Sequence, residues 1–235
     1  MPSETVTSWR ALDDAISGSE LGRHGNRIHS TLVFRGLARS SYSNVSSLAR
    51  LGGDFADLER HLVRNFRKYA HREMPGPTTW DWLSLAQHHG LPTRLLDWTF
   101  SPLIALHFAT ASWPDDDAVL LAVDCEGAHR LLPESPRELL DKEGALVFPT
   151  ELLAECASDV GELDELGAEH DPFIVFFEPP SLDERIINQA AVLSAMSDPT
   201  YQLEDWLEAI PTCGTPGSYR PRSRPRCASI WIRRT

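Results

Sequence analysis

Several features that identify common protein classes are scarce or absent in this chain of 235 residues. No apolar run approaches the ~18 residues of a membrane span, and the start, MPSETVTSWRALDD, lacks the basic region and apolar stretch of a signal peptide. There are four cysteines, far apart and without a Cys-x-x-Cys pair, which argues against both a zinc site and a disulfide framework. We therefore expect a cytoplasmic protein with free thiols, no membrane partner and no metal. The four are Cys125, Cys156, Cys213 and Cys227.

Basic side chains are also scarce, with 22 lysines and arginines against 34 aspartates and glutamates and a formal net charge of −12. Six of the arginines lie within residues 220–235, which hold no acid, so the preceding 219 residues carry −18. So acidic a body repels nucleic acid over most of its surface. A nucleic-acid contact is expected only through the basic tail, and a solvated chain end is the alternative.

The composition that remains, 42% hydrophobic and 24% charged, is that of an ordinary globular protein. A chain of this length can bury roughly 70% of its unfolded surface, which is enough to fold without a disulfide or a structural metal. We expect an N-terminal helix and loop over 1–26, one domain over 27–205, and a basic Pro/Arg-rich tail over 206–235.

Strand and helix patterns are mixed without strict alternation, which favours an α+β domain with a small mixed or antiparallel sheet flanked by helices. TLVFRG, AVLLAVD, FIVFFEP and the late CASIWI are the expected strands, and residues 181–196 fit a helix or a strand. Helices are expected over 9–17, 54–72, from Thr78 or Thr79 to Gly90, and from Ser101-Pro102 onward. Residues 127–170 are helix-prone. For 54–72, Asp54 is the expected cap, and the expected buried face is Phe55, Leu58, Leu62, Phe66 and Tyr69.

Four stretches, in order along the chain, resemble the FRG domain family. Phe34-Arg35-Gly36 is the tripeptide for which the family is named, and SSLAR (46–50), WLSLAQHHGLPTRLLDWTFSPLIALHFAT (82–110) and RIINQ (185–189) follow. The resemblance covers about residues 9–200 and breaks after about 205. It implies a bacterial or phage cytoplasmic module, in some cases linked to phage defence or toxin systems.

Arg35 stands at the end of a strand, and its guanidinium offers five donors in a rigid fork that suits phosphate or carboxylate. Gly36 lets the backbone turn and a ligand come near. An ion pair between Arg35 and one of the many acids is the alternative.

A second candidate group surrounds the expected helix start at Ser101. Such an N-terminus, with Thr99 before it, suits a phosphate or a ribose hydroxyl, although Ser101 can simply cap the helix. Arg94 and Asp97 lie just upstream, and they can line the same site or form an ion pair that holds the loop.

His88 is a candidate general base near neutral pH, with structural polar packing as the alternative. Because adjacent helical residues point about 100° apart, His88 and His89 make a poor metal pair. Arg185 and Gln189 share one face whether their segment is helix or strand, so both can reach one pocket. Pairing of Arg185 with Asp97 is the alternative.

A more distant resemblance is to ADP-ribosyltransferases, through the arginine and glycine of a first strand and the later strand, turn and helix. That resemblance implies that Arg35 grips NAD, that Thr99 and Ser101 stand for the serine-threonine strand, and that Gln189 takes the first place of Gln-x-Glu. Ala191 stands where the glutamate is expected. The absence of this glutamate would slow transfer about 10²–10³-fold unless another carboxylate takes its role. The candidates for that role are Asp97, Glu178 and Glu184.

These expectations combine in an NAD- or nucleotide-binding enzyme that acts on an unknown macromolecular target, as a toxin or phage-defence effector, and that uses no metal. A non-catalytic module that senses a ligand or phage component is the alternative, and a phosphate-directed hydrolase is a third reading. The proposal requires Arg35, Thr99 and Gln189 to meet around one cavity. The expected catalytic residues are Arg35, His88, Asp97 and Gln189, and the expected cofactor contacts are Arg35, Gly36, Arg94, Thr99, Ser101 and Arg185.

Overall fold

The structure is a computed structural model that describes residues 3–8, 10–12, 14, 31–53, 55–70, 78–113, 115–181, 188–209 and 227–232. The chain divides into two compact units. The first unit comprises residues 1–43, 98–130 and 207–235, and the second comprises residues 44–97 and 131–206.

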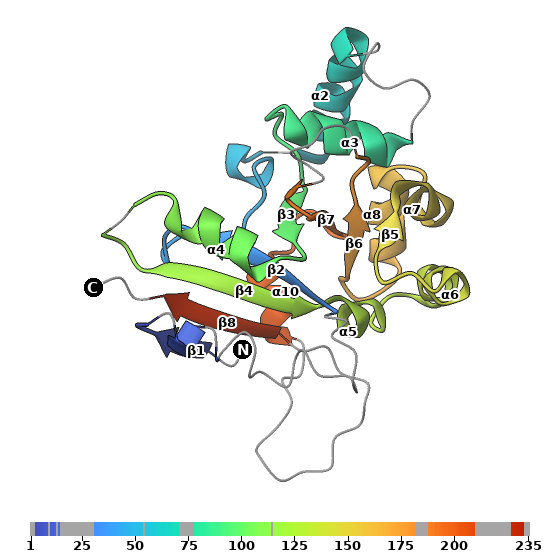
Figure 1. The fold of residues 1–235 in the computed structure, drawn as a ribbon. Helices are drawn as coiled ribbons and strands as arrows, with labels where there is room; N and C mark the ends of the chain where they lie inside the picture. Colours follow the sequence, from blue (N-terminus) through green and yellow to red (C-terminus); the bar gives the residue numbers. More distant parts are fainter. Residues whose placement is uncertain are drawn as a thin grey trace. The chain divides into compact units, whose positions relative to one another are not determined.

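Among the described residues, the first unit contains the strands β1, β8, β4 and β2 in that order, together with the end of β3 (Figure 1). β1 is parallel to β8, whereas β8–β4 and β4–β2 are antiparallel. Thr99, the last residue of β3, pairs antiparallel with Phe34 of β2. The strand bounds are β1 Ser3–Val6, β2 Leu32–Leu37, β3 Leu96–Thr99, β4 Ala118–Asp124 and β8 Cys227–Ile232.

Helix α4 (Pro102–Thr110) covers one face of β2 and β4 (Figure 1). It begins as the sequence predicts, because the Ser101 hydroxyl accepts a hydrogen bond from the Ile104 N–H at 3.4 Å and Pro102 occupies the first turn. The backbone of α4 rests directly on Gly36, where a Cβ atom would overlap the Ala105 carbonyl oxygen and lie 2.8 Å from the Ala109 nitrogen. Gly36 therefore serves helix–strand packing. The unit also contains the short helix α5 (Cys125–His129).

In its described residues, the second unit contains the start of β3, the strands β5, β6 and β7, and most of the helices. β5 (Phe148–Pro149) is parallel to β6 (Ile174–Glu178), which is antiparallel to β7 (Ala191–Met196). Helix α7 packs against β5 and β6 (Figure 1). The helices are η2 Ala49–Leu51, α2 Phe55–Ala70, α3 Thr79–His88, α6 Glu134–Glu143, α7 Thr150–Cys156 and α8 Val160–Ala168, and α10 Leu203–Ala209 begins in this unit.

Trp80 of α3 lies at the centre of the second unit's core. Its ring meets the edge of Phe177 at a centroid distance of 5.5 Å, and its indole N–H donates to the Ala157 carbonyl at 2.8 Å. Both rings are fully buried. The indole N–H of this buried tryptophan is thus hydrogen-bonded to the backbone.

The α+β class with a mixed sheet is confirmed, since each unit combines helices with parallel and antiparallel strand pairs. The strands expected from TLVFRG, AVLLAVD, FIVFFEP and CASIWI form, and the open choice over 181–196 resolves to a strand from Ala191. Thr78 caps the start of α3, and Gly90, just beyond the end of this helix, has a φ of 79°. The boundaries at 26/27 and 205/206 stay predictions, although β8 lies within the expected tail.

Several expectations need correction or fall outside the described residues. Tyr69 is 88% exposed. The other four residues of the expected α2 face are half-buried, and Glu59, Val63 and Ala70 are the buried positions of this helix. β1 was not expected, because SETV is short and polar. The opening helix is seen only at residues 10–12 and 14, whereas the loop over 18–27 and the Asp54 cap lie outside the described residues.

Within the described residues, no helix has the length and apolar character that crossing a lipid bilayer requires.

Candidate functional site

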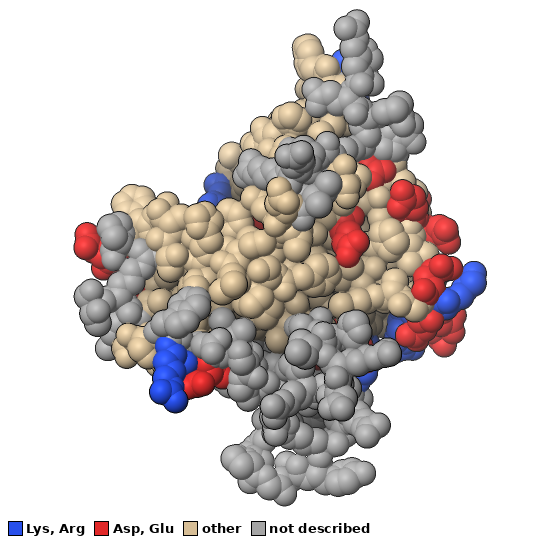
Figure 2. Space-filling model, in the orientation of Figure 1, with Lys and Arg blue, Asp and Glu red and all other residues tan. Residues whose placement is uncertain are grey.

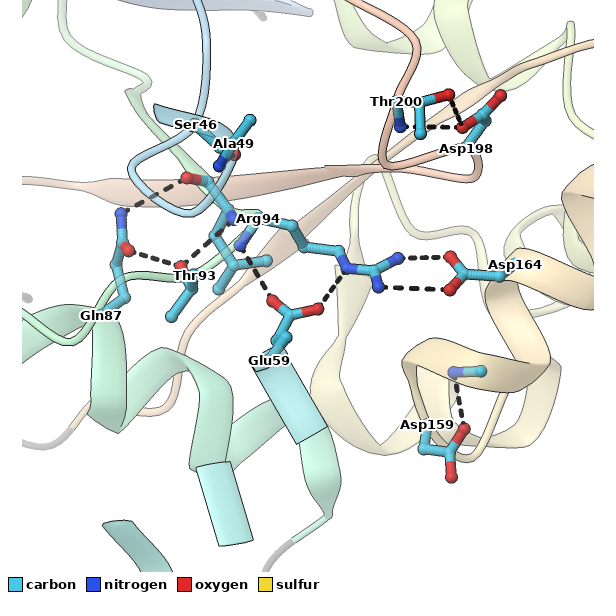
Figure 3. Close-up of polar contacts among 12 residues, drawn as sticks. Ser46, Ala49, Glu59, Gln87, Thr93, Arg94, Asp159, Asp164, Asp198 and Thr200 are labelled. Atoms are coloured by element: carbon cyan, nitrogen blue, oxygen red, sulfur yellow. Dashed lines mark hydrogen bonds and ion pairs between the residues drawn. The ribbon is translucent and has the colours of Figure 1, made fainter. Parts of the chain in front are cut away.

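A network of polar side chains in the second unit leads from the end of α3 to the exposed Asp97 carboxylate. Figure 3 shows its Gln87 and Thr93. The Gln87 amide nitrogen donates to both carboxylate oxygens of Asp97, at 3.2 and 3.1 Å. The Gln87 amide oxygen accepts a hydrogen bond from the Thr93 hydroxyl at 2.6 Å, and that hydroxyl accepts from the Leu95 N–H at 3.2 Å. Asp97 is exposed. The arrangement therefore fixes the orientation of a carboxylate that faces solvent.

The loop that carries this network is anchored to a segment about 45 residues earlier. The Thr93 N–H donates to the Ser47 hydroxyl at 3.1 Å, and the Thr93 carbonyl accepts from that hydroxyl at 3.2 Å and from the Leu48 N–H at 3.1 Å. Two of the sequence stretches singled out above, SSLAR and LPTRLLDWT, therefore meet here.

Arg94 lies beside this network but points into the protein (Figure 3). Its Nε and its backbone N–H donate to the two oxygens of the Glu59 carboxylate at 2.6 and 2.9 Å. Its two terminal nitrogens donate to the Asp164 carboxylate. The side chains of Arg94, Glu59 and Asp164 are 3%, 0% and 25% exposed.

Burial by itself would lower the pKa of the Arg94 guanidinium, but the charge of Glu59 and the charge and hydrogen bonds of Asp164 outweigh it and raise that pKa above its ordinary value. Arg94 is therefore a cation held by two acids in the core of the unit. The ion pair that the sequence suggested between Arg94 and Asp97 is replaced by pairs with Glu59 and Asp164.

His88 and His89 end α3 next to Gln87. His88 is half-buried and His89 is exposed, and their rings lie 5.4 Å apart, nearly perpendicular. The His89 ring also lies 5.9 Å from that of Phe66 on α2. The role of His88 as a base stays a prediction.

The remaining expected residues of the first unit lie on two faces of its sheet. Since Phe34 pairs with Thr99, these two side chains share a face with Gly36 and α4, whereas Arg35 points to the opposite face. Arg35 is half-buried there, on the face of β3 that carries the buried Trp98. Arg35 and Thr99 therefore do not converge, and the expectation that they line one cavity is wrong.

The hydroxyls near the start of α4 serve the local turn. Thr99 accepts from the Ser101 N–H at 3.0 Å, and Ser101 accepts from the Ile104 N–H. The backbone donors that were expected to hold a phosphate are thus partly used within the chain.

Gln189 lies in the second unit, in the turn before β7, and is half-buried. Ala191, which stands at the position of the expected glutamate, is the first residue of β7. Arg185 and Glu184 lie outside the described residues.

Sequence reasoning missed Glu59, Asp164, Gln87, Thr93 and Ser47 as parts of this polar core. Glu59 had a usable signal, because it lies four residues before Val63 on the face that continues to Ala70. Asp164 had none, since it is 70 residues from Arg94 in the sequence.

Searches of curated proteins and of solved structures found no match to this chain. Residues 30–118 match the family model of the FRG domain. That range holds β2, α2, α3, β3 and α4, and with them Arg35, Gln87, Thr93, Arg94 and Asp97. Residues 30–118 are thus identified as FRG-domain sequence.

Proposed function

We propose that this FRG domain binds NAD or a similar nucleotide through the Asp97 carboxylate, and that it acts as an NAD-dependent transferase or effector in phage defence or a toxin system. The observation that carries the proposal is the exposed Asp97 carboxylate, held by Gln87 at 3.1 and 3.2 Å. The NAD and effector parts rest on the resemblance to ADP-ribosyltransferases and to other FRG proteins.

The chemistry of Asp97 suits a ribose. An ionised carboxylate only accepts hydrogen bonds, and it has about four acceptor positions on two oxygens. Gln87 reaches both oxygens with a single nitrogen, and Asp97 is exposed to solvent. Ribose hydroxyls can donate to such a carboxylate, as they do to the acidic residue of dinucleotide-binding folds.

The other expected residues fit NAD unequally. Arg94 does not fit as a contact to the pyrophosphate, because its fork is occupied by Glu59 and Asp164 in the core. His88 and Gln189 are half-buried residues of the second unit.

We also propose that Asp97 takes the role of the transferase glutamate, because Ala191 stands at the position of that glutamate. The chemistry that NAD would supply is a glycosidic bond to nicotinamide, whose cleavage releases the ADP-ribosyl group for transfer. A negative charge held near that ribose favours the positive charge that develops there.

The test combines binding and turnover. Titration calorimetry with NAD measures Kd, and chromatography measures nicotinamide release. Asp97→Asn should weaken NAD binding about 10–100-fold, because a hydrogen bond to a charged group contributes roughly 1.5–3 kcal/mol. Asp57→Asn is the matched control, since Asp57 is another exposed acid of the same unit, and its Kd should stay within about twofold. An unchanged Kd in Asp97→Asn would remove Asp97 from the site.

A second candidate is a non-catalytic module that senses a nucleotide. The observation that favours it is Ala191, which leaves the start of β7 without the transferase carboxylate. NAD binding that depends on Asp97 without nicotinamide release, in the presence of cell lysate as a source of targets, would select this candidate over the enzyme.

A further inference from the structure

Helix α2 carries a cluster of cations in a chain that is otherwise acidic. Apart from the six arginines of residues 220–235, the chain has 16 lysines and arginines, and four of them lie within nine residues of α2. All four side chains are exposed. They are Arg60, Arg64, Arg67 and Lys68.

The four cations share one side of the helix. Residues four and seven positions apart return to nearly the same side of an α-helix, so Arg60, Arg64 and Arg67 lie within an arc of about 60°, and Lys68 widens it to about 100°. The arc also holds Asp57, which is 3.9 Å from Arg60, but no apolar residue of Phe55–Ala70. We call these four cations and Asp57 the α2 basic face, and their formal charges sum to +3.

Two arginines of this face have uncharged partners. Arg64 donates a hydrogen bond to ring nitrogen Nδ1 of His61 at 3.3 Å. The Arg67 guanidinium lies over the Trp82 ring of α3, 5.3 Å from the ring centroid. Among the described residues, neither Arg64 nor Arg67 forms an ion pair with a carboxylate. These contacts hold the arginines in place without neutralising their charge.

The acidic residues of the second unit lie mainly on other helices. α6, α7 and α8 together hold nine acidic residues and two basic ones. Figure 2 shows acidic side chains gathered over the part of the second unit that Figure 1 labels α6 and α7. The other acid of α2, Glu59, is fully buried and paired with Arg94. The acidic composition of the chain is therefore compatible with a positive α2 basic face.

We propose that the α2 basic face binds the phosphate backbone of double-stranded DNA without reading its base sequence. A duplex carries one negative charge per ~1.7 Å of its axis, so the distance of about 10 Å from Arg60 to Arg67 along the helix faces several phosphates. The planar guanidinium fork suits phosphate oxygens. The proposal is independent of the nucleotide site, and it places a DNA contact outside the basic tail.

The composition of the α2 basic face selects this partner. Protein interfaces have an apolar core from which charged residues are depleted, and a basic helix on a membrane inserts its apolar side. The α2 basic face has no apolar residue, and Val63 and Ala70 on the other side of the helix are buried in the second unit.

The form of the nucleic acid follows from the same residues. Single strands bind where aromatic platforms accompany the cations, and the arc of α2 that holds the arginines contains no aromatic residue. Among duplexes, B-form DNA has a major groove wide enough to admit a helix, whereas that of A-form RNA is narrow.

The test is fluorescence anisotropy of a labelled DNA duplex of about 20 base pairs with the full chain, in salt from about 50 to 200 mM. Combining Arg60→Gln with Arg64→Gln should weaken binding at least about tenfold at the lowest salt. It should also reduce the slope of log K against log salt by about 2, because two phosphate contacts are lost. Arg64→Lys keeps the charge and should bind within about threefold of the parent chain.

The matched control combines Arg137→Gln with Lys142→Gln on the acidic helix α6. It removes the same charge from the chain and should change Kd less than about twofold. All these side chains are exposed or half-buried, so the variants should keep the far-ultraviolet circular dichroism of the parent chain.

The basic tail is intact in every variant, so a chain that binds DNA only through its tail would lose nothing when Arg60 and Arg64 are replaced. That result would overturn the proposal, and so would equal losses in the α2 and α6 variants. Tighter binding of a glutamate-rich peptide, of phosphatidylserine vesicles, of single-stranded DNA or of an RNA duplex than of the DNA duplex would overturn it as well.

Discussion

Replacing Arg94 by methionine should destabilise the second unit strongly, because it removes the cation from a buried cluster of charges. The Glu59 carboxylate is fully buried, and in Arg94→Met the partner that it keeps among the described residues is the backbone N–H of residue 94. Removing one partner of a buried ion pair costs about 3–5 kcal/mol, since the other charge remains uncompensated. Methionine retains much of the apolar stem, so the loss reports mainly the charge.

The sign of a second substitution makes the prediction sharper. Adding Glu59→Gln to Arg94→Met removes the uncompensated charge, so the double variant should be more stable than Arg94→Met alone by about 1–3 kcal/mol. In an otherwise unchanged chain, Glu59→Gln should be destabilising, because Arg94 then lacks its nearest counter-charge. Arg60→Met is the matched control on the same helix: Arg60 is 62% exposed and 3.9 Å from Asp57, and its loss should stay below about 0.5 kcal/mol.

The assay is urea unfolding followed by tryptophan fluorescence, which reports on Trp80 and Trp82 in the core of the same unit. With a slope of roughly 2–3 kcal/mol per molar urea, Arg94→Met should lower the midpoint by about 1–2 M. A loss below about 1 kcal/mol would refute the reasoning, and so would a double variant less stable than Arg94→Met. Either result would mean that the pair does not compensate a buried charge.

Three further predictions follow from local geometry. Gly36→Ala should lower the free energy of unfolding by at least about 1–3 kcal/mol in thermal unfolding, because its Cβ would overlap the Ala105 carbonyl. Gly161→Ala, whose Cβ would meet a side-chain oxygen at 3.1 Å, should lower it clearly less. An equal loss in both variants would contradict the close approach of α4 to Gly36. Burial raises the pKa of the Cys156 thiol to about 11. Alkylation of Cys156 at pH 8, followed by peptide mass spectrometry, should therefore be about 100-fold slower than alkylation of a free cysteine, and its rate should rise through pH 10–11. A rate at pH 8 equal to that of free cysteine would contradict this prediction. Thr78→Ala removes the hydroxyl that caps α3 and should cost about 1 kcal/mol in urea unfolding, and no loss would show that the cap is dispensable.

The start and end signals of several elements were readable in the sequence because they are local. Thr78, Gly90 and Ser101-Pro102 act on backbone groups within four residues, and the structure confirms each of them. The apolar run AVLLAVD also formed the expected buried strand. These features need no knowledge of the rest of the fold.

The polar core of the second unit was not readable, because its partners come from distant segments. Arg94 meets Glu59 and Asp164, which lie 35 and 70 residues away. The separation of Arg35 from Thr99 was not readable either. Strand alternation alone puts Arg35 and Gly36 on opposite faces of β2. The pairing of Phe34 with Thr99 is what places Thr99 on the face of Gly36 and α4.

Tyr69 shows why an apolar pattern alone misplaced the buried face of α2. The sequence pattern included this residue, but it is 88% exposed, and the carboxylate of Glu59 occupies the buried side instead. A buried acid is rare unless it has a partner, and the partner was not visible without the fold.

The central claim, that Asp97 receives a ribose, is tested most directly by removing the hydroxyls from the ligand as well as the carboxylate from the protein. Titration calorimetry would compare NAD with two analogues, each lacking the 2′,3′-diol of one ribose, in the parent chain and in Asp97→Asn. The account predicts that the parent chain prefers NAD to one analogue by at least about tenfold and that Asp97→Asn loses this preference. An equal preference in both proteins, or none in the parent chain, would contradict it.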